Sequence, residues 1–223
     1  MAATLIIFVR HGKTPTTGTK LPGSAPNLHL SNEGKLQAEI VAKEIEKSSS
    51  SFLGKKVAAV YASPMERTQE TAKPIAKVLN LRVRTLQGLN ECDFGDWTGR
   101  RLRELSKLKS WSTVQKQPSS FRFPNGESFT EMQNRMLKTV DKLVERHSGE
   151  TVICVSHADP IKAILSSAIG TPLDMFQRIV VGPCSTSVVL YTKERPLVLT
   201  LNSNGNFSGS LGSYTTSLFI VSY

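Results

Sequence analysis

Short apolar runs alternate with amphipathic stretches along most of this chain. The runs at 5–9, 57–61 and 151–155 are rich in aliphatic and β-branched residues, and each stops at polar residues. Short runs bounded in this way are typical of buried strands. We expect three further strands, the last two paired with each other, at residues 82–86, 188–191 and 197–201.

Helices are predicted between these strands. From about Ser31 apolar residues recur at helical spacing and define one face, which holds Leu36, Ile40, Val41 and Ile45. The basic stretch 100–109 predicts a short helix. Another helix is expected over 159–169, with Gly170 as its C-cap.

Two of the predicted helix starts carry a capping box. Ser63 has a proline directly after it and Glu66 three residues later, which favours a helix beginning at this point. Ser128 and Glu131 repeat the pattern ahead of a long amphipathic stretch. Pro74 lies inside the first of these helices and should kink or restart it.

The alternation of strands and helices predicts an α/β fold, namely a three-layer α/β/α sandwich. Its central sheet should be mostly parallel, with helices on both faces. The length of 223 residues is compatible with one domain, with a core at about 4–201 and a C-terminal extension at 202–223. Residues 202–217 read as a flexible tail rich in Ser, Asn and Gly, and 218–221 could add an edge strand.

The positive net charge of the chain favours an anionic binding partner. The chain has 28 Lys and Arg against 18 Asp and Glu, a formal net charge of +10 that suits nucleic acid, an acidic membrane surface or a phosphorylated small molecule. The basic residues are dispersed and aromatic residues make up only 7%, which disfavours a nucleic-acid-binding arm. No apolar run is long enough to span a membrane, and the N-terminus lacks a signal-peptide pattern, so we expect a soluble, cytoplasmic protein. Three widely spaced cysteines imply no disulfide framework.

Basic side chains and histidines follow the three best strands. Arg10 and His11 come directly after the first strand, Arg67 falls in the helix after the second, and His157 follows the third. Ligand sites in parallel sheets lie beyond the carboxyl ends of the strands, so these side chains should meet. Arginine suits phosphate oxygens, and a histidine among such donors is a plausible nucleophile toward phosphorus.

Five segments give the chain a resemblance to a known family. They are RHGKT at 10–14, SPMERTQETA at 63–72, LNECDFGDWTG at 89–99, PNGES at 124–128 and VSHADPIKAIL at 155–165. In this order and spacing they resemble the histidine phosphatase superfamily, the phosphoglycerate mutase-like proteins, over residues 4–201.

The resemblance implies a role for each matching residue. His11 would be the nucleophile that becomes phosphohistidine, and Arg10 and Arg67 would bind phosphate. His157 would be the second histidine of the pocket and donate to the phosphoryl oxygens. Glu91 would donate the proton to the leaving oxygen.

Three further residues are candidates for the same site. Thr14 belongs to the RHGKT segment. Thr17 stands where family members often carry Asn, six residues after the nucleophile, and its hydroxyl is a phosphate donor of shorter reach. Asp159 lies two residues after His157 and is either a second candidate for the proton donor or simply an N-cap before a proline.

The implied mechanism has two steps and calls for no cofactor. His11 attacks with one neutral ring nitrogen, so its other nitrogen should donate to a backbone carbonyl. Glu91 protonates the departing alkoxide and then acts as base toward water. Two histidines and two arginines would surround the phosphate, so no metal is expected, and the sequence holds no metal-ligand or Walker A motif.

The segment after the acid separates the two activities of the superfamily. Mutases of this type typically carry Arg-His-Tyr-Gly there, whereas this chain has CDFGDW at 92–97, which resembles the phosphatase branch. We therefore expect metal-independent hydrolysis of a small phosphorylated metabolite, with mutase activity as the alternative. A non-catalytic phospholigand-binding module is a second hypothesis, and the presence of every expected catalytic residue type speaks against it. The sequence predicts neither the substrate nor the oligomeric state.

Overall fold

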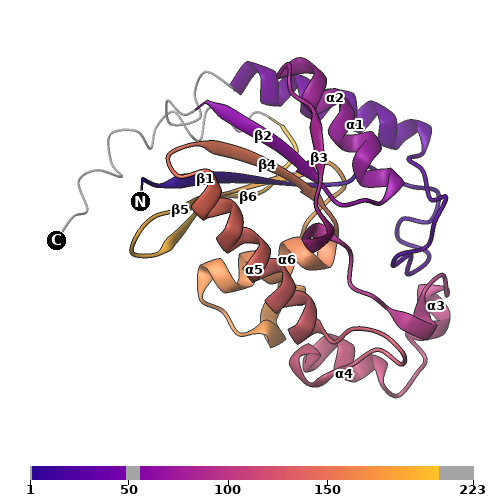
Figure 1. Ribbon diagram of the computed structural model, residues 1–223. Coiled ribbons are helices and arrows are strands. Elements are labelled where there is room, and N and C mark those ends of the chain that lie inside the picture. Colours follow the sequence, from indigo (N-terminus) through magenta and orange to yellow (C-terminus); the bar gives the residue numbers. More distant parts are fainter. Residues whose placement is uncertain (1, 49–55, 206–223) are drawn as a thin grey trace.

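A single mixed sheet organises the part of the chain that the computed structural model describes, residues 2–48 and 56–205 (Figure 1). Within these residues the sheet has six strands in the order β3-β2-β4-β1-β5-β6. In chain order they are β1 (Thr4–Arg10), β2 (Val57–Ala62), β3 (Val83–Thr85), β4 (Thr151–Ser156), β5 (Thr186–Tyr191) and β6 (Pro196–Ser203).

The sheet is mostly parallel, as predicted. β1, β2 and β3 run in the direction of β4, whereas β5 is antiparallel to β1 and β6 is antiparallel to β5. In the register of the central pair, Phe8 lies opposite Cys154 and Arg10 lies opposite Ser156. The carboxyl ends of β1, β2 and β4 therefore meet at one edge of the sheet.

Helices cover both faces and complete the expected three layers (Figure 1). The pair α1 (Asn32–Ser48) and α2 (Glu66–Val78) packs on one face, and α5 (Phe129–Arg146) and α6 (Ala158–Ile169) pack on the other. Side chains of β1 alternate between the layers, so that Ile7 faces α1 and α2 while Ile6 faces α5 and α6.

An aromatic subcluster supports the long connection between β3 and α5. Its buried rings include Phe94, Trp97, Phe121, Phe123 and Phe129. The short helix expected at 100–109 is confirmed only over α3 (Leu102–Leu105), a single turn, and α4 (Trp111–Lys116) follows separately. The intervening turn lets Trp111 stack on Trp97, with ring centroids 6.2 Å apart. This connection also contains short 3-10 turns at Gln87–Leu89, Gly95–Trp97 and Pro118–Ser120, and a further 3-10 turn, Leu173–Arg178, follows α6.

The predicted face of α1 is confirmed in part. Val41 and Ile45 are buried, whereas Leu36 and Ile40 are 62% and 49% exposed. Ala38 and Ala42 complete the buried face, because small side chains let α1 pack closely against α2.

The helix starts give one correction and one confirmation. The capping box at Ser63 is wrong, because α2 begins at Glu66 after an N-cap at Met65 and no side chain caps it. The box at Ser128 is confirmed in both directions, with Glu131 as its partner. Pro74 lies within the continuous span of α2, so the predicted restart is also wrong.

The C-terminal expectations lie partly beyond the described residues. β6 runs to Ser203, so the boundary expected at residue 202 falls inside a strand. The edge strand at 218–221 and most of the predicted tail lie outside the described residues. Among the described helices, none is both long and apolar enough to cross a membrane. The three cysteines are buried and free.

Candidate active site

Strand pairing brings the two predicted histidines together at the carboxyl edge of the sheet. The amide of His11 donates to the carbonyl of Ser156 over 3.0 Å, one residue before His157. The two imidazole rings lie nearly edge to face, with centroids 5.2 Å apart and an interplanar angle of 63°. Both side chains are buried, so the structure confirms the predicted meeting of these residues.

The backbone sets the tautomer of His11. Its Nδ1 lies 2.8 Å from the carbonyl oxygen of Gly12, and a carbonyl only accepts, so Nδ1 carries the proton. Burial, followed by the charges of Arg67 and Arg10, holds the pKa of His11 well below its usual value. The ring is therefore neutral and keeps the Nε2 lone pair for attack, as the sequence predicted.

Gly12 lets the segment after β1 approach α1. A Cβ at this position would lie 2.5 Å from the carbonyl oxygen of Gly34 in α1. The amide of Gly12 also donates to Thr71 Oγ1 in α2 over 3.0 Å. The loop after β1 is thus held by both helices of one layer.

His157 contacts the hydroxyl of Ser63, a residue that the sequence pattern had predicted to cap a helix. Its Nε2 lies 2.8 Å from Ser63 Oγ, which is also 2.8 Å from Thr68 Oγ1. The buried Nδ1 of His157 has no hydrogen-bond partner. Ser63 directly follows β2, so applying the strand-end rule to this serine, as to the histidines, would have found it.

Arg67 is a fully buried cation with unused donors. Its Nη2 donates to the carbonyl oxygen of Gly23 over 2.7 Å, while Nε and Nη1 have no partner. Nη1 of Arg10 likewise donates to the carbonyl oxygen of Val181 over 2.7 Å, and Nε of Arg10 has no partner. Within the described residues, neither guanidinium forms a salt bridge. Unpaired buried cations are costly, so this arrangement suits an anion.

Glu91 has the protonation behaviour of a general acid. Burial, and next the carboxylate of Asp159, raise the pKa of Glu91 to about 7, against the opposing charge of Arg67. Its Oε1 accepts from the amide of Cys92 over 3.1 Å. A carboxyl poised near neutrality can give up a proton in one step and take one back in the next.

Asp159 is not the N-cap that its place before Pro160 indicated. α6 begins at Ala158 with His157 as N-cap, which puts Asp159 in the first turn. Its Oδ1 accepts from Lys162 Nζ over 3.3 Å. Asp159 therefore faces the site as a charge near Glu91 and Arg10, with one oxygen engaged by an ammonium.

The two threonines of the following loop bond to each other. Thr17 Oγ1 accepts from the amide of Thr14 over 2.9 Å and lies 3.0 Å from Thr14 Oγ1. This contact closes a turn just after the nucleophile segment. A phosphate contact from Thr17 or Thr14 stays a prediction.

The family assignment follows from a comparison of the whole sequence. The family model for the histidine phosphatase superfamily (branch 1) matches residues 6–204. The chain belongs to this superfamily.

Curated relatives and solved structures agree with the membership. This histidine phosphatase-superfamily chain is 28% identical to phosphoserine phosphatase 1 of Hydrogenobacter thermophilus, over 88% of this chain and 91% of that one. It is also 28% identical to a probable phosphoglycerate mutase, GpmB, of Yersinia enterocolitica, over 83% and 84% of the two chains. The fold resembles phosphoserine phosphatase of Entamoeba histolytica, with a TM-score of 0.80 at 23% identity, covering 91% of this chain and 98% of that one.

Three of the hollows among the described residues bear on this site. Glu91 borders an open one of about 470 Å³, which Asp93 and Glu127 also line. Asp159 borders a largely apolar one of about 270 Å³, with Phe94 and Trp111 in its wall.

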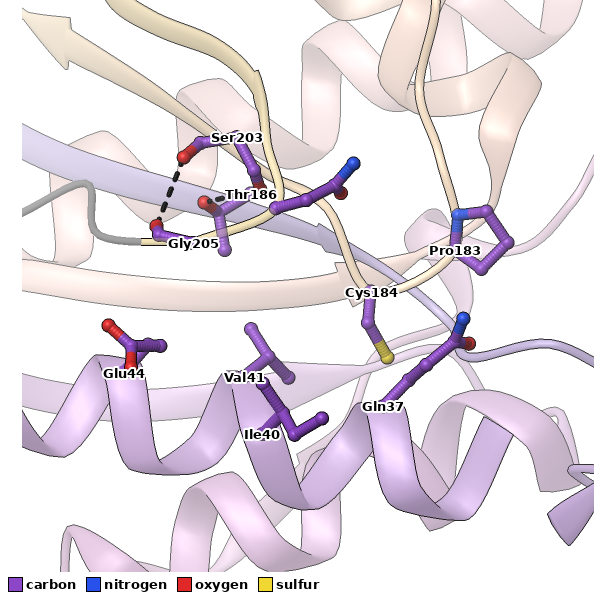
Figure 2. A pocket seen from close by; sticks show the side chains of 10 residues that line it. Gln37, Ile40, Val41, Glu44, Pro183, Cys184, Thr186, Ser203 and Gly205 are labelled. Atoms are coloured by element: carbon purple, nitrogen blue, oxygen red, sulfur yellow. Dashed lines mark hydrogen bonds between the residues drawn. The ribbon is translucent and has the colours of Figure 1, made fainter. Parts of the chain in front are cut away.

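The third hollow lies between α1 and the start of β5 (Figure 2). It measures about 330 Å³, and its lining contains no histidine, lysine or arginine. Cys184 links it to the site through the backbone, because its amide donates to the carbonyl oxygen of Arg10 over 3.1 Å. This hollow therefore offers no cationic side chain to a phosphate group.

We predict that Arg67→Met weakens the binding of phosphate without lowering the stability of the ligand-free protein. Removing a buried, unpaired charge should leave the apo protein at least as stable, because methionine needs no desolvation of a cation. Inorganic phosphate at about a hundredfold excess over its Kd should stabilise the wild type by about 2.7 kcal/mol and the variant far less. Thermal unfolding with and without phosphate measures both effects, and exposed Arg82→Met is the control. An undiminished phosphate response in Arg67→Met would remove Arg67 from the site.

Proposed function

We propose that this chain hydrolyses phosphomonoesters of small metabolites through a phosphohistidine on His11, without a metal ion. The observation that carries the proposal is the neutral, buried His11 beside the buried Arg67 and the part-buried Arg10, both of which have unused donors. A phosphoryl group would engage those donors and present its phosphorus to Nε2. The arginines supply the positive charge that a metal ion would otherwise provide.

The first step forms the phosphohistidine. Nε2 of His11 attacks phosphorus, the bond from phosphorus to the ester oxygen breaks, and Glu91 gives its proton to that oxygen. The product alcohol leaves. Ser63 Oγ can donate to Nε2 of His157, so that the unpartnered Nδ1 of His157 carries a proton to donate to a phosphoryl oxygen.

The second step restores the enzyme. Glu91, now a carboxylate, takes a proton from a water molecule whose oxygen attacks phosphorus. The bond from phosphorus to Nε2 breaks, phosphate is released and Glu91 is protonated again. Its pKa of about 7 suits both roles near neutral pH.

The hollow beside Glu91 favours hydrolysis over mutase chemistry. Asp93 and Glu127 line it, and the one arginine there, Arg135, is paired with Glu127 over 2.8 Å. A second anionic group that pointed into this hollow would meet these carboxylates, so the carboxylate of a substrate such as phosphoserine would have to lie outside it. Both phosphatases and a mutase occur among the relatives, so the substrate class we propose is a small phosphorylated metabolite, of which phosphoserine and 3-phosphoglycerate are the first to test. We propose neither nucleic acid nor a membrane as partner.

The test measures phosphate release in the presence of a chelator. Substrates are 4-nitrophenyl phosphate, phosphoserine, 3-phosphoglycerate, a sugar phosphate and a nucleoside monophosphate, at pH values from about 5 to 8. A parallel assay follows interconversion of 2- and 3-phosphoglycerate. Turnover in chelator with slower interconversion supports the proposal. Faster interconversion, or no hydrolysis by folded protein, overturns it.

A further inference from the structure

The loop that carries Glu91 has little regular structure of its own. It follows β3, and its only regular element is the 3-10 turn Gln87–Leu89. Beyond that turn, backbone hydrogen bonds of a sheet or helix do not hold the segment 91–93. Its conformation, and hence the place of the Glu91 carboxyl, depends on contacts from elsewhere.

Arg135 in α5 supplies three of those contacts, and Ser156 Oγ donates to the carbonyl oxygen of Leu89 over 2.7 Å. Nη1 of Arg135 donates to the carbonyl oxygens of Gly88 and Asn90 over 2.9 and 3.0 Å, and Nη2 donates to that of Glu91 over 3.2 Å. Nε and Nη2 also donate to the two carboxylate oxygens of Glu127, over 3.0 and 2.8 Å. These contacts use all five donors of a guanidinium.

Glu127 holds the other end of the loop. Its amide donates to the carbonyl oxygen of Asp93 over 2.8 Å, and its Oε2 accepts from the amide of Asp93 at 3.3 Å. Gly126 permits this approach, because a Cβ there would lie 2.5 Å from the same Asp93 oxygen. The backbone on both sides of Glu91 is therefore clamped by one ion pair.

We propose that Arg135 is a positioning residue for Glu91, acting through the loop backbone and fixed in turn by Glu127. This inference rests on the proposed function. The fork shape of the guanidinium matters more than its charge, since three carbonyls and a bidentate carboxylate must be reached from one side chain. A lysine would keep the charge and lose most of these contacts.

The test uses two substrates that differ in their need for a proton. The leaving group of phenyl phosphate is a basic phenolate that Glu91 must protonate. The leaving group of 4-nitrophenyl phosphate is a weakly basic anion. Single-turnover transfer to His11 in Arg135→Lys should be about 10²-fold slower with phenyl phosphate and within about threefold of wild type with the nitrophenyl ester. Equal losses with both esters, or no loss with either, would overturn the inference.

Matched variants keep the result interpretable. Arg122→Lys is the control, because Arg122 is an exposed arginine that bonds the carbonyl of Gly126 and pairs with Glu131 outside the loop. Glu127→Gln retains the heavy-atom shape while weakening the clamp, so it carries the same test if Arg135→Lys does not fold. In a Glu91→Gln background, Arg135→Lys should cause no further selective loss, and an additive loss would contradict the proposed route. Absence of any transfer in the wild type would count against the proposed function instead.

Discussion

Replacing His11 with asparagine is expected to lower kcat/KM for phosphate release by about 10³-fold or more, since loss of a covalent nucleophile is among the most damaging changes an enzyme can suffer. Asparagine can still donate to the carbonyl of Gly12, the bond that His11 Nδ1 makes over 2.8 Å. The loop should therefore keep its shape while the attacking nitrogen is lost. The effect reports on chemistry and not on folding.

The measurement pairs turnover with trapping of the intermediate. Rapid denaturation in base during turnover should recover a phosphohistidine from the wild type and none from His11→Asn. His29→Asn is a matched control, because His29 is an exposed histidine whose ring pairs with Glu70 over 2.6 Å. If turnover of His11→Asn stayed within tenfold of wild type, His11 would not be the nucleophile.

Glu91→Gln is expected to lower kcat/KM for phenyl phosphate by about 10²–10⁴-fold, the usual contribution of a general acid. The pH profile should change with it. Because the pKa of Glu91 is about 7, the protonated form that donates is abundant below pH 7 and falls tenfold per pH unit above it. The wild-type rate should decline through about pH 7, and this decline should vanish in Glu91→Gln.

The same shift has a consequence for stability. The pKa of Glu91 is raised on folding from its ordinary 4.5, so the folded state binds more protons than the unfolded state between these values. Stability contributed by this group therefore falls as pH rises from about 4.5 to about 7. Above pH 7, Glu91→Gln should unfold at a higher temperature than the wild type, and no difference at high pH would contradict the burial argument.

Asp159→Asn separates the two candidates for the proton donor. The carboxylate of Asp159 helps to raise the pKa of Glu91, so its removal should move the alkaline limb of the pH profile to lower pH and leave it intact. Disappearance of the limb in Asp159→Asn, with retention in Glu91→Gln, would make Asp159 the donor.

The residues that directly follow a strand were the ones that sequence reasoning placed best. Arg10, His11 and His157 each adjoin a short apolar run, and a parallel sheet gathers such positions at one edge whatever the details of packing. The capping box at Ser128 was also predicted correctly, because Ser128 and Glu131 are only three residues apart in the sequence. The capping box predicted at Ser63 was wrong because other partners compete for its hydroxyl. Ser63 Oγ bonds Thr68 and lies beside His157 instead of capping α2.

The chain's pattern of apolar runs and its five motifs determined by themselves the layers of the fold and its family, because strands, helices and strand ends follow from neighbours in sequence. They also predicted which residues would form a phosphate pocket. Only the tertiary structure decided which face of α1 is buried, which donors of Arg67 remain free, and how Arg135 holds the loop of Glu91 from 44 residues away. Those features arise from close packing and from the desolvation of charges, which depend on groups distant along the chain. The pKa of Glu91 belongs with them, because burial and Asp159 set it, and neither can be read from the segment in which Glu91 lies.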